Sequence, residues 1–147
     1  MEDERKDIIH IPDPRFFDYL AENFVLTGDG EISVEEAKSI REIVCPAAGI
    51  QSLEGIEYFE NLTRLDCPLN RLISLDISKN TKLAELDCRF NFIGELDLSN
   101  SPVLRTVFTK GNRLKILDLS YIQDHMDLID ADNDTKLMVE FDLPDKS

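Results

Sequence analysis

Residues 83–93 read LAELDCRFNFI, and the same pattern occurs one repeat earlier as LTRLDCPLNRL (62–72) and one repeat later as LRTVFTKGNRL (104–114). Each copy continues into a second half of the form LDxS, beginning at Leu75, Leu96 and Leu117. A weaker first copy precedes them, with Ala48 in place of the asparagine and one extra residue before the next copy. A fixed period of about 21 residues is typical of stacked repeats, so the sequence predicts a solenoid.

The pattern LxxLxLxxNxL is the signature of leucine-rich repeats. It predicts an α/β solenoid, a short right-handed coil with one row of parallel strands. Alternation within LxxLxL directs Leu65 and Cys67 inward and Arg64, Asp66 and Pro68 outward. Because one coil cannot bury its own apolar edge, neighbouring coils are expected to stack and share a continuous core.

Two kinds of polar residue recur with the repeat, and they are Asn70, Asn91 and Asn112, and Asp76, Asp97 and Asp118. We expect the asparagines to point inward, where their amides can bond to turn backbone groups that water cannot reach. Each aspartate lies two residues before a serine, a spacing that favours Asx turns. A line of cation sites along the aspartates is the alternative interpretation.

The three cysteines, Cys45, Cys67 and Cys88, occupy one position on successive copies. Adjacent strands lie about 4.8 Å apart, and parallel side chains would miss the roughly 3.8 Å Cβ approach of a disulfide. We therefore predict three buried free thiols. A zinc site is the alternative, although a straight row of thiolates is not tetrahedral. Both histidines, His10 and His125, lie outside the repeats.

Residues 12–40 have the pattern of a helical cap that closes the N-terminal end of the solenoid. Asp13 followed by Pro14 is typical of a helix start, and aromatic and aliphatic residues follow at mostly helical spacing. A second short helix is expected from Ser33, with Glu36 completing a capping box.

The segment between these helices, TGDGEISVEE (27–36), is similar to the latter part of an EF-hand calcium loop. Gly30 stands at the sharp turn and Glu36 at the last ligand position. Val25 and Thr27 stand where the first two acidic ligands belong, so we predict no metal site and no cofactor here.

The repeat weakens after Ser120. Segments 126–131 and 136–143 alternate like strands around Asp132-Asn133-Asp134, which predicts a closing β-hairpin. Asp130, Asp132 and Asp134 imitate the start of a calcium loop, but Thr135 and Phe141 replace its glycine and glutamate. The expected organisation is an N-terminal cap at 1–39, repeats at 40–121 and a C-terminal cap at 122–147, all in one structural domain.

Two runs before the repeats, together with the repeats themselves, carry a resemblance to a known group of proteins. IPDPRFFDYLAENF (11–24) and GDGEISVEEA (28–37), followed by LxxLDCxxNxL units, resemble leucine-rich-repeat surface proteins of anaerobic gut bacteria, and the internalins show a similar plan of cap and repeats. The resemblance covers about residues 11–120. It implies an exported or cell-surface binding module with a curved parallel sheet and no reaction of its own. The chain departs from the group at Val25 and Thr27, where Asp and Asn are usual.

Composition limits the classes of partner. The 147 residues include 16 basic and 30 acidic side chains, a formal net charge of −14. Such acidity argues against unspecific binding to nucleic acid or anionic membranes, and no apolar run approaches the roughly 18 residues of a membrane span. Met1 to Asp7 contain no signal-peptide core. We expect a secreted or cell-surface protein whose leader is outside this chain, and a cytoplasmic location stays open.

Function is expected on the outward positions of the strand row, because inward positions report packing. The candidate binding residues of this concave face are Arg64, Asp66, Glu85, Asp87, Arg89, Phe90, Thr106, Phe108 and Lys110. Arginine and phenylalanine are residue types that often anchor interfaces. The alternative for Phe90 and Phe108 is that they cover a coil edge or contact the C-terminal cap.

The leading hypothesis is a non-catalytic interaction module that binds a protein or glycan through this face. A second hypothesis is a hydrolase that uses a carboxylate pair such as Glu85 and Asp87. A third is a calcium-stabilised spacer. No nucleophile motif, phosphate-binding glycine loop or HExxH sequence is present, so we predict that the chain is not an enzyme.

Overall fold

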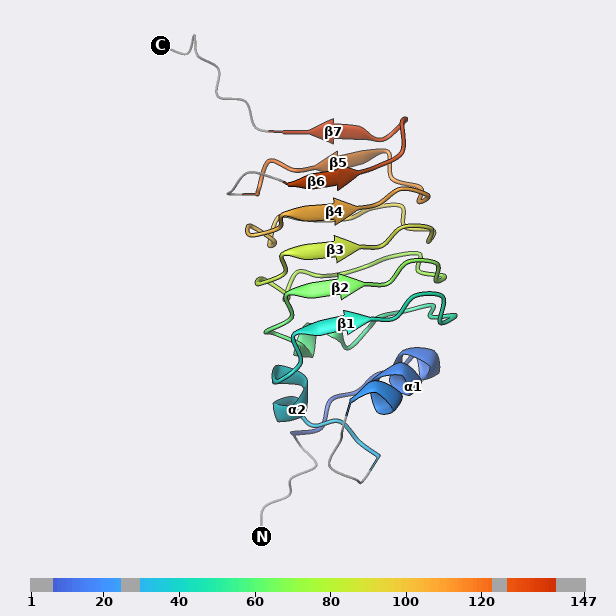
Figure 1. Ribbon diagram of the computed structural model, residues 1–147, viewed down its shortest axis with the longest axis vertical. Helices are drawn as coiled ribbons and strands as arrows, with labels where there is room; N and C mark the ends of the chain where they lie inside the picture. The colour runs from blue at the N-terminus through green and yellow to red at the C-terminus, as the bar shows by residue number, and fades with distance from the viewer. Residues whose placement is uncertain (1–6, 25–29, 123–126, 140–147) are drawn as a thin grey trace.

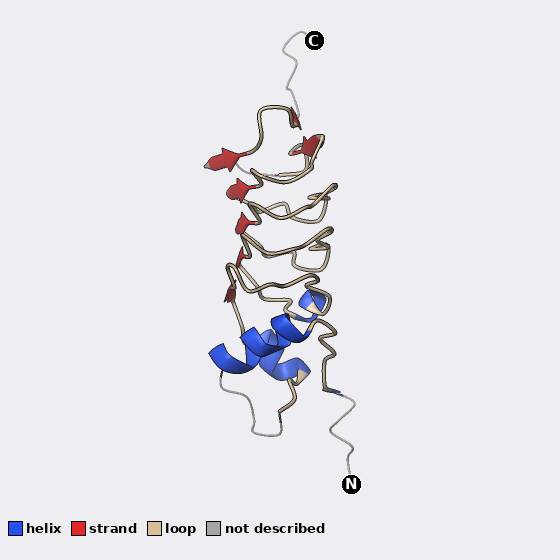
Figure 2. Cartoon of the chain, turned by 90° about the vertical axis from the view of Figure 1, so that its right-hand side faces the viewer, coloured by secondary structure: helices blue, strands red, loops and turns tan. Residues whose placement is uncertain are grey.

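The computed structural model describes residues 7–24, 30–122 and 127–139, which form a stack of coils with helices at the N-terminal end (Figure 1). A five-stranded parallel sheet runs along one side of the stack (Figure 2). Its strands are β1 (Glu42–Val44), β2 (Arg64–Asp66), β3 (Glu85–Asp87), β4 (Thr106–Phe108) and β6 (Leu128–Asp130). The opposite side carries the 3-10 helix η2 (Ile56–Tyr58) and a two-stranded sheet of β5 (Ile116–Asp118) and β7 (Lys136–Met138). The predicted leucine-rich-repeat solenoid is confirmed.

The strand register follows the repeat of the sequence. Leu65 of β2 is the partner of Leu86 in β3, and Leu86 is the partner of Val107 in β4. These three side chains are at most 1% exposed and form one column of the core. Burial of each such side chain contributes about 1.5–3 kcal/mol, so stacking is the main source of stability.

The repeated asparagines form the predicted inward ladder. The Asn91 amide nitrogen donates to the carbonyls of Cys67 and Cys88 at 3.0 and 3.1 Å, and its oxygen accepts the Leu72 N–H at 3.0 Å. One side chain thereby bonds to its own coil and to the coil before it. Equivalent bonds to two successive coils are made by Asn70 and Asn112.

The structure contains a further buried amide that the sequence analysis missed. Asn80 is fully buried, and its amide nitrogen donates to the carbonyls of Ile56 and Phe59 at 2.9 and 3.1 Å. The residue one repeat later is the buried Ser101. Because the positions equivalent to Asn80 do not repeat asparagine, periodicity alone could not single it out.

The recurring aspartates form the predicted Asx turns. Asp76, Asp97 and Asp118 accept the backbone N–H of the serine two residues later at 2.9, 2.8 and 3.0 Å. Hydrogen bonds from these serines lower the pKa of each aspartate. These bonds offset the repulsion expected between like charges on neighbouring coils.

The cysteines are buried free thiols, as predicted. Cys45, Cys67 and Cys88 directly follow strands β1, β2 and β3, and their side chains are at most 2% exposed. Burial raises the pKa of Cys45 and of Cys88 to about 12 and raises that of Cys67 as well. Thiols that stay protonated behave as small apolar core residues.

The N-terminal cap is tied to the first coil through one carboxylate. Helix α1 (Pro14–Asn23) begins after Asp13, whose Oδ1 accepts two N–H groups of the first turn at 2.8 and 3.2 Å. The Oδ2 atom of Asp13 accepts the N–H groups of Gln51 and Ser52 at 2.8 and 2.9 Å. Helix α2 (Val34–Lys38) has the predicted capping box.

Helix α1 also covers the open end of the core. Phe16 and Leu20 are at most 1% exposed, and the Phe16 ring packs 6.4 Å from that of Phe59. The Tyr19 hydroxyl accepts the Val44 N–H at 2.8 Å, which occupies a backbone donor on the edge strand β1. The EF-hand-like positions Val25 and Thr27 lie outside the described residues.

The predicted C-terminal hairpin is wrong. Strand β6 pairs with β4 and strand β7 pairs with β5, both in parallel, so the two segments continue two sheets and do not pair with each other. Val107 is the partner of Ile129, so this coil is one residue longer than the two coils directly before it. Counting in steps of 21 residues from Val107 leads to Leu128, whereas the strand partner of Val107 is Ile129. Because of this difference of one residue, the sequence analysis missed a further coil.

Replacement of Asn91 by alanine should lower the free energy of unfolding by about 3 kcal/mol, because buried carbonyls and an N–H lose their partner. Urea denaturation measures the loss. The exposed Asn100→Ala variant serves as the control and should change stability by less than about 0.5 kcal/mol. Equal effects of the two variants would contradict the structural role of the ladder.

Replacement of Asp13 by alanine should destabilise the chain by about 1–2 kcal/mol near neutral pH. Burial raises the pKa of Asp13, but the backbone hydrogen bonds that its carboxylate accepts together lower the pKa by more, so the net pKa lies below the usual 3.8. A carboxyl with a lowered folded pKa stabilises above its unfolded pKa, and this stabilisation is lost as the pH falls through the folded value.

Urea titrations of wild type and Asp13→Ala from pH 7 to pH 2.5 should therefore show a constant gap above about pH 4 that narrows below it. The exposed Asp18→Ala variant of the same helix is the control. A gap that widens on acidification would contradict the assignment.

Candidate binding face

All nine candidate residues lie on the outward side of the five-stranded sheet or in the turns that directly follow it. They are Arg64 and Asp66 on β2, Glu85 and Asp87 on β3, Thr106 and Phe108 on β4, and Arg89, Phe90 and Lys110 in the following turns. Each of the nine is exposed or half-buried. The middle residue of each of these three strands points inward and is buried. Stacking thus gathers residues from three coils onto one surface, which we call the sheet face.

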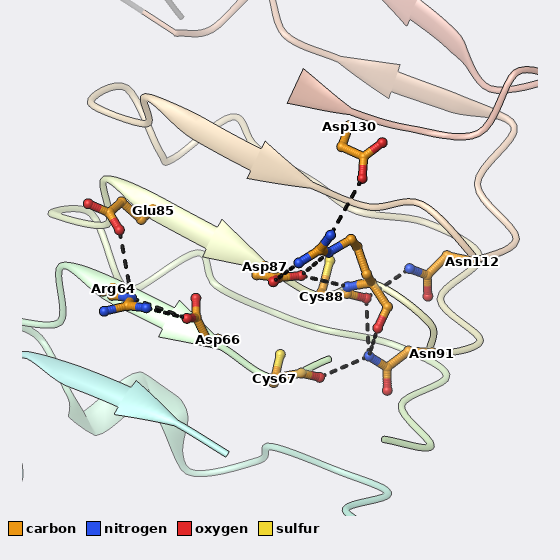
Figure 3. A network of polar contacts seen from close by, with 10 residues as sticks. Arg64, Asp66, Cys67, Glu85, Asp87, Cys88, Asn91, Asn112 and Asp130 are labelled. Carbon is orange, nitrogen blue, oxygen red and sulfur yellow. Dashed lines mark hydrogen bonds and ion pairs between the residues drawn. The ribbon is translucent and has the colours of Figure 1, made fainter. Parts of the chain in front are cut away.

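Arg64 is held by carboxylates of the sheet face (Figure 3). Its guanidinium donates to Asp66 at 2.7 and 3.1 Å and approaches Glu85 and Glu42 at 3.7 and 3.8 Å. The hydrogen bond to Asp66 raises the pKa of Arg64. Alternate residues of one strand point to the same side, which explains why Arg64 and Asp66 meet.

Arg89 makes the corresponding pair on the next coil. Its Nε and Nη2 atoms donate to the two oxygens of Asp87 at 2.9 and 2.8 Å, a bidentate geometry, and Asp130 lies 3.8 Å away. The guanidinium also stands 4.9 Å from the centre of the Phe108 ring. Phe108 occupies the position that is aspartate in the two preceding coils, so Arg89 has a carboxylate of its own coil on one side and an aromatic ring of the next coil on the other.

Phe90 has two roles in the structure. Its ring lies over Gly111 of the next coil, where a Cβ atom would collide with it, and its side chain is still 50% exposed. The interpretation that Phe90 covers a coil edge and the interpretation that it is presented to solvent therefore both hold. Lys110 is exposed and forms no ion pair with a described residue.

The chemistry of the sheet face is that of a contact surface. Glu85 and Asp87 are each paired with an arginine. In the part of the chain that the structure describes, no group of three or more His, Cys, Asp or Glu residues could hold a metal ion. Nor does any helix of that part have the length and apolar character needed to cross a bilayer.

Comparisons with known proteins agree on the fold. No protein-family model matches the chain. Over 70 residues it is 33% identical to Internalin J of Listeria monocytogenes, a match that covers 48% of this chain and 8% of that protein. A crystal structure of the L. monocytogenes internalin InlF superposes with a TM-score of 0.66 at 20% identity, covering 95% of this chain and 47% of the other.

The functional domain of InlJ from the same species, which includes a cysteine ladder, superposes with a TM-score of 0.59 at 24% identity. This match covers 90% of our chain and 34% of the solved one. The fold and sheet face thus define a leucine-rich-repeat solenoid with a helical cap. Within that class, the chain is similar to the internalins, and it spans less than half the length of the relatives it matches.

The double variant Phe90→Ser/Phe108→Ser should remain folded and lose about 1–2 kcal/mol in urea denaturation, because both rings lie on the surface. Leu86→Ala is the reference for a core position, since Leu86 is 1% exposed, and should cost about 2–5 kcal/mol. If the double variant lost as much as Leu86→Ala, the two rings would be core residues and not part of a contact surface.

Proposed function

We propose that the chain is a non-catalytic interaction module that binds a protein partner through the sheet face and acts in a secreted or cell-surface protein. Its relatives by sequence and fold are internalins, and solenoids of this kind present extended binding surfaces. A protein partner is favoured over a glycan because the face combines fixed charges with the rings of Phe90 and Phe108.

The observation that carries the proposal is the fixed geometry of the charged side chains. Arg64 is bound to Asp66, and Arg89 is bound to Asp87 and stacked on Phe108. Side chains already held in one arrangement lose less conformational entropy when a partner binds.

The pairing also supports a non-catalytic role. A carboxylate pair for hydrolysis needs one group that can donate a proton and a pocket around the reacting bond. Glu85 and Asp87 stand instead on the exposed surface of β3 opposite arginines at 3.7 and 2.8 Å. This arrangement suits charge recognition.

The test is a screen of the biotinylated chain, made tetravalent on streptavidin, against an array of purified extracellular protein domains. We expect saturable binding to at least one domain, weakened at least tenfold by Phe90→Ser/Phe108→Ser. The control Tyr58→Ser/Val103→Ser changes two side chains that are each 38% exposed and lie outside the strand row. Binding that is lost equally in both variants, or unchanged in the first, would refute the role of the sheet face.

A further inference from the structure

A second surface of the molecule has a composition unlike the rest. The turns that follow the strands stack into a strip, which we call the basic flank, and its segments are 46–51, 68–74, 89–94 and 110–116. These segments contain no aspartate or glutamate, but Glu95 directly follows the third segment, and the Asp132 carboxylate accepts the Gly111 N–H at 3.0 Å. Four exposed cations lie on the strip, and they are Arg71, Lys110, Arg113 and Lys115.

The four exposed cations of the basic flank differ from the arginines on and beside the sheet face, because those arginines are paired with carboxylates. Arg64, Arg89 and Arg105 are each within 2.8 Å of a carboxylate oxygen. The four exposed cations of the flank form no ion pair with any residue that the structure describes. Arg113 contacts an aromatic ring, with its guanidinium 5.0 Å from the centre of Phe92.

Large apolar side chains alternate with these cations. Leu69, Ile73, Phe90 and Phe92 are 57%, 71%, 50% and 45% exposed. The Leu69 N–H bonds to the Arg89 carbonyl and the Phe90 N–H to the Lys110 carbonyl, so the strip is continuous from coil to coil. A contiguous exposed apolar patch of this kind marks an interaction surface.

Backbone geometry shows that these side chains occupy an unfavourable position for their size. Leu69 and Phe90 have φ angles of 60° and 58°, in the left-handed region that favours glycine. The equivalent residue of the next coil is Gly111, with φ 82°. Glycine would fit this backbone conformation at lower cost. Packing on Gly111 accounts for only part of the Phe90 ring, because Leu69 and Phe90 are both at least half exposed.

We infer that the basic flank is a docking surface for an acidic segment of a partner protein, in which carboxylates alternate with apolar side chains. The unpaired cations supply attraction for carboxylates, and the exposed Leu69, Ile73, Phe90 and Phe92 supply apolar contacts. The net charge of −14 does not prevent this, because charges are screened beyond about 8 Å at physiological ionic strength. At short range the attraction comes from the four exposed cations, which form no ion pair with a described residue.

The aliphatic residues favour a peptide over a nucleic acid or an acidic glycan. Leu69 and Ile73 have no ring on which a base or a sugar could stack, and one face of the Phe92 ring is already covered by Arg113. A shallow groove beside Gly94, lined by Ile73, Arg113, Lys115 and Ile116 among others, can receive side chains of the segment. Four carboxylates, Asp76, Glu95, Asp97 and Asp118, line the groove as well, so the partner's carboxylates are expected beside Arg113 and Lys115.

This inference does not rest on the proposed function, although the basic flank shares Arg89, Phe90 and Lys110 with the sheet face. The test selects random dodecapeptides displayed on phage against the immobilised chain. We expect the selected pool to be enriched in Asp or Glu together with Leu, Ile or Phe. Fluorescence anisotropy with the enriched peptides should show at least tenfold weaker binding to Arg71→Glu/Lys115→Glu, and weaker binding to wild type as NaCl rises from about 50 to about 300 mM.

Two matched variants make the result specific. Lys79→Glu/Lys82→Glu changes the net charge equally outside the strip and should bind as wild type does. Phe108→Ser changes a strand residue of the sheet face that lies outside the flank segments, and this variant should bind the peptides as wild type does. Loss of peptide binding in Phe108→Ser would assign the peptides to the sheet face and overturn the inference.

Gly94→Glu provides a second route if the double reversal fails to fold by circular dichroism. A Cβ atom at Gly94 meets nothing within 4 Å, so this variant adds a carboxylate to the groove without a clash and should weaken binding several-fold. The inference is overturned if no peptide is enriched, if the pool lacks acidic residues, or if charge reversal and Gly94→Glu leave binding unchanged. Displacement of the peptides by single-stranded DNA or a heparin fragment at lower concentration would overturn it in favour of those ligands.

Discussion

The structure depends on the requirement that each coil be completed by its neighbours. The inward column of Leu65, Leu86 and Val107 is fully covered only because coils stack, and the Asn91 amide satisfies carbonyls of two coils at once. An apolar column alone would tolerate slippage between coils, whereas an amide with fixed donor and acceptor directions does not. The asparagines therefore set the register, and the register decides which side chains face solvent.

Most of this arrangement could be predicted from the sequence, because a constant repeat length assigns each position to the core or the surface. The Asx turns, the cysteine positions and the caps of both helices follow from local rules and are confirmed. The C-terminal prediction failed where the repeat became one residue longer, at Ile129. Within the candidate site, periodicity could not reveal that Arg64 and Arg89 are bound by aspartates of their own coils, since pairing depends on side-chain direction.

Charge is distributed over the solenoid in a way that its net value hides. The sheet face holds arginines that are paired with carboxylates, while the four exposed cations of the adjoining basic flank form no ion pair with a described residue. Both surfaces are consequences of the same stacking, because residues one repeat apart lie side by side and a local composition is multiplied along the axis. A short leucine-rich-repeat protein can in this way present two chemically distinct surfaces.

The central claim is that equivalent positions of successive coils are neighbours, and a set of distances between paired spin labels tests it most directly. The native cysteines are replaced by alanine, and cysteine labels are placed in pairs at Glu42 and Thr106, and at Glu42 and Leu128. These strand positions are exposed or half-buried and belong to one column, in which the two pairs lie three and four strands apart. At about 4.8 Å per strand, we predict distances between the labelled positions of about 14 Å for the first pair and about 19 Å for the second. Distances that do not increase by one strand spacing between the two pairs would contradict it.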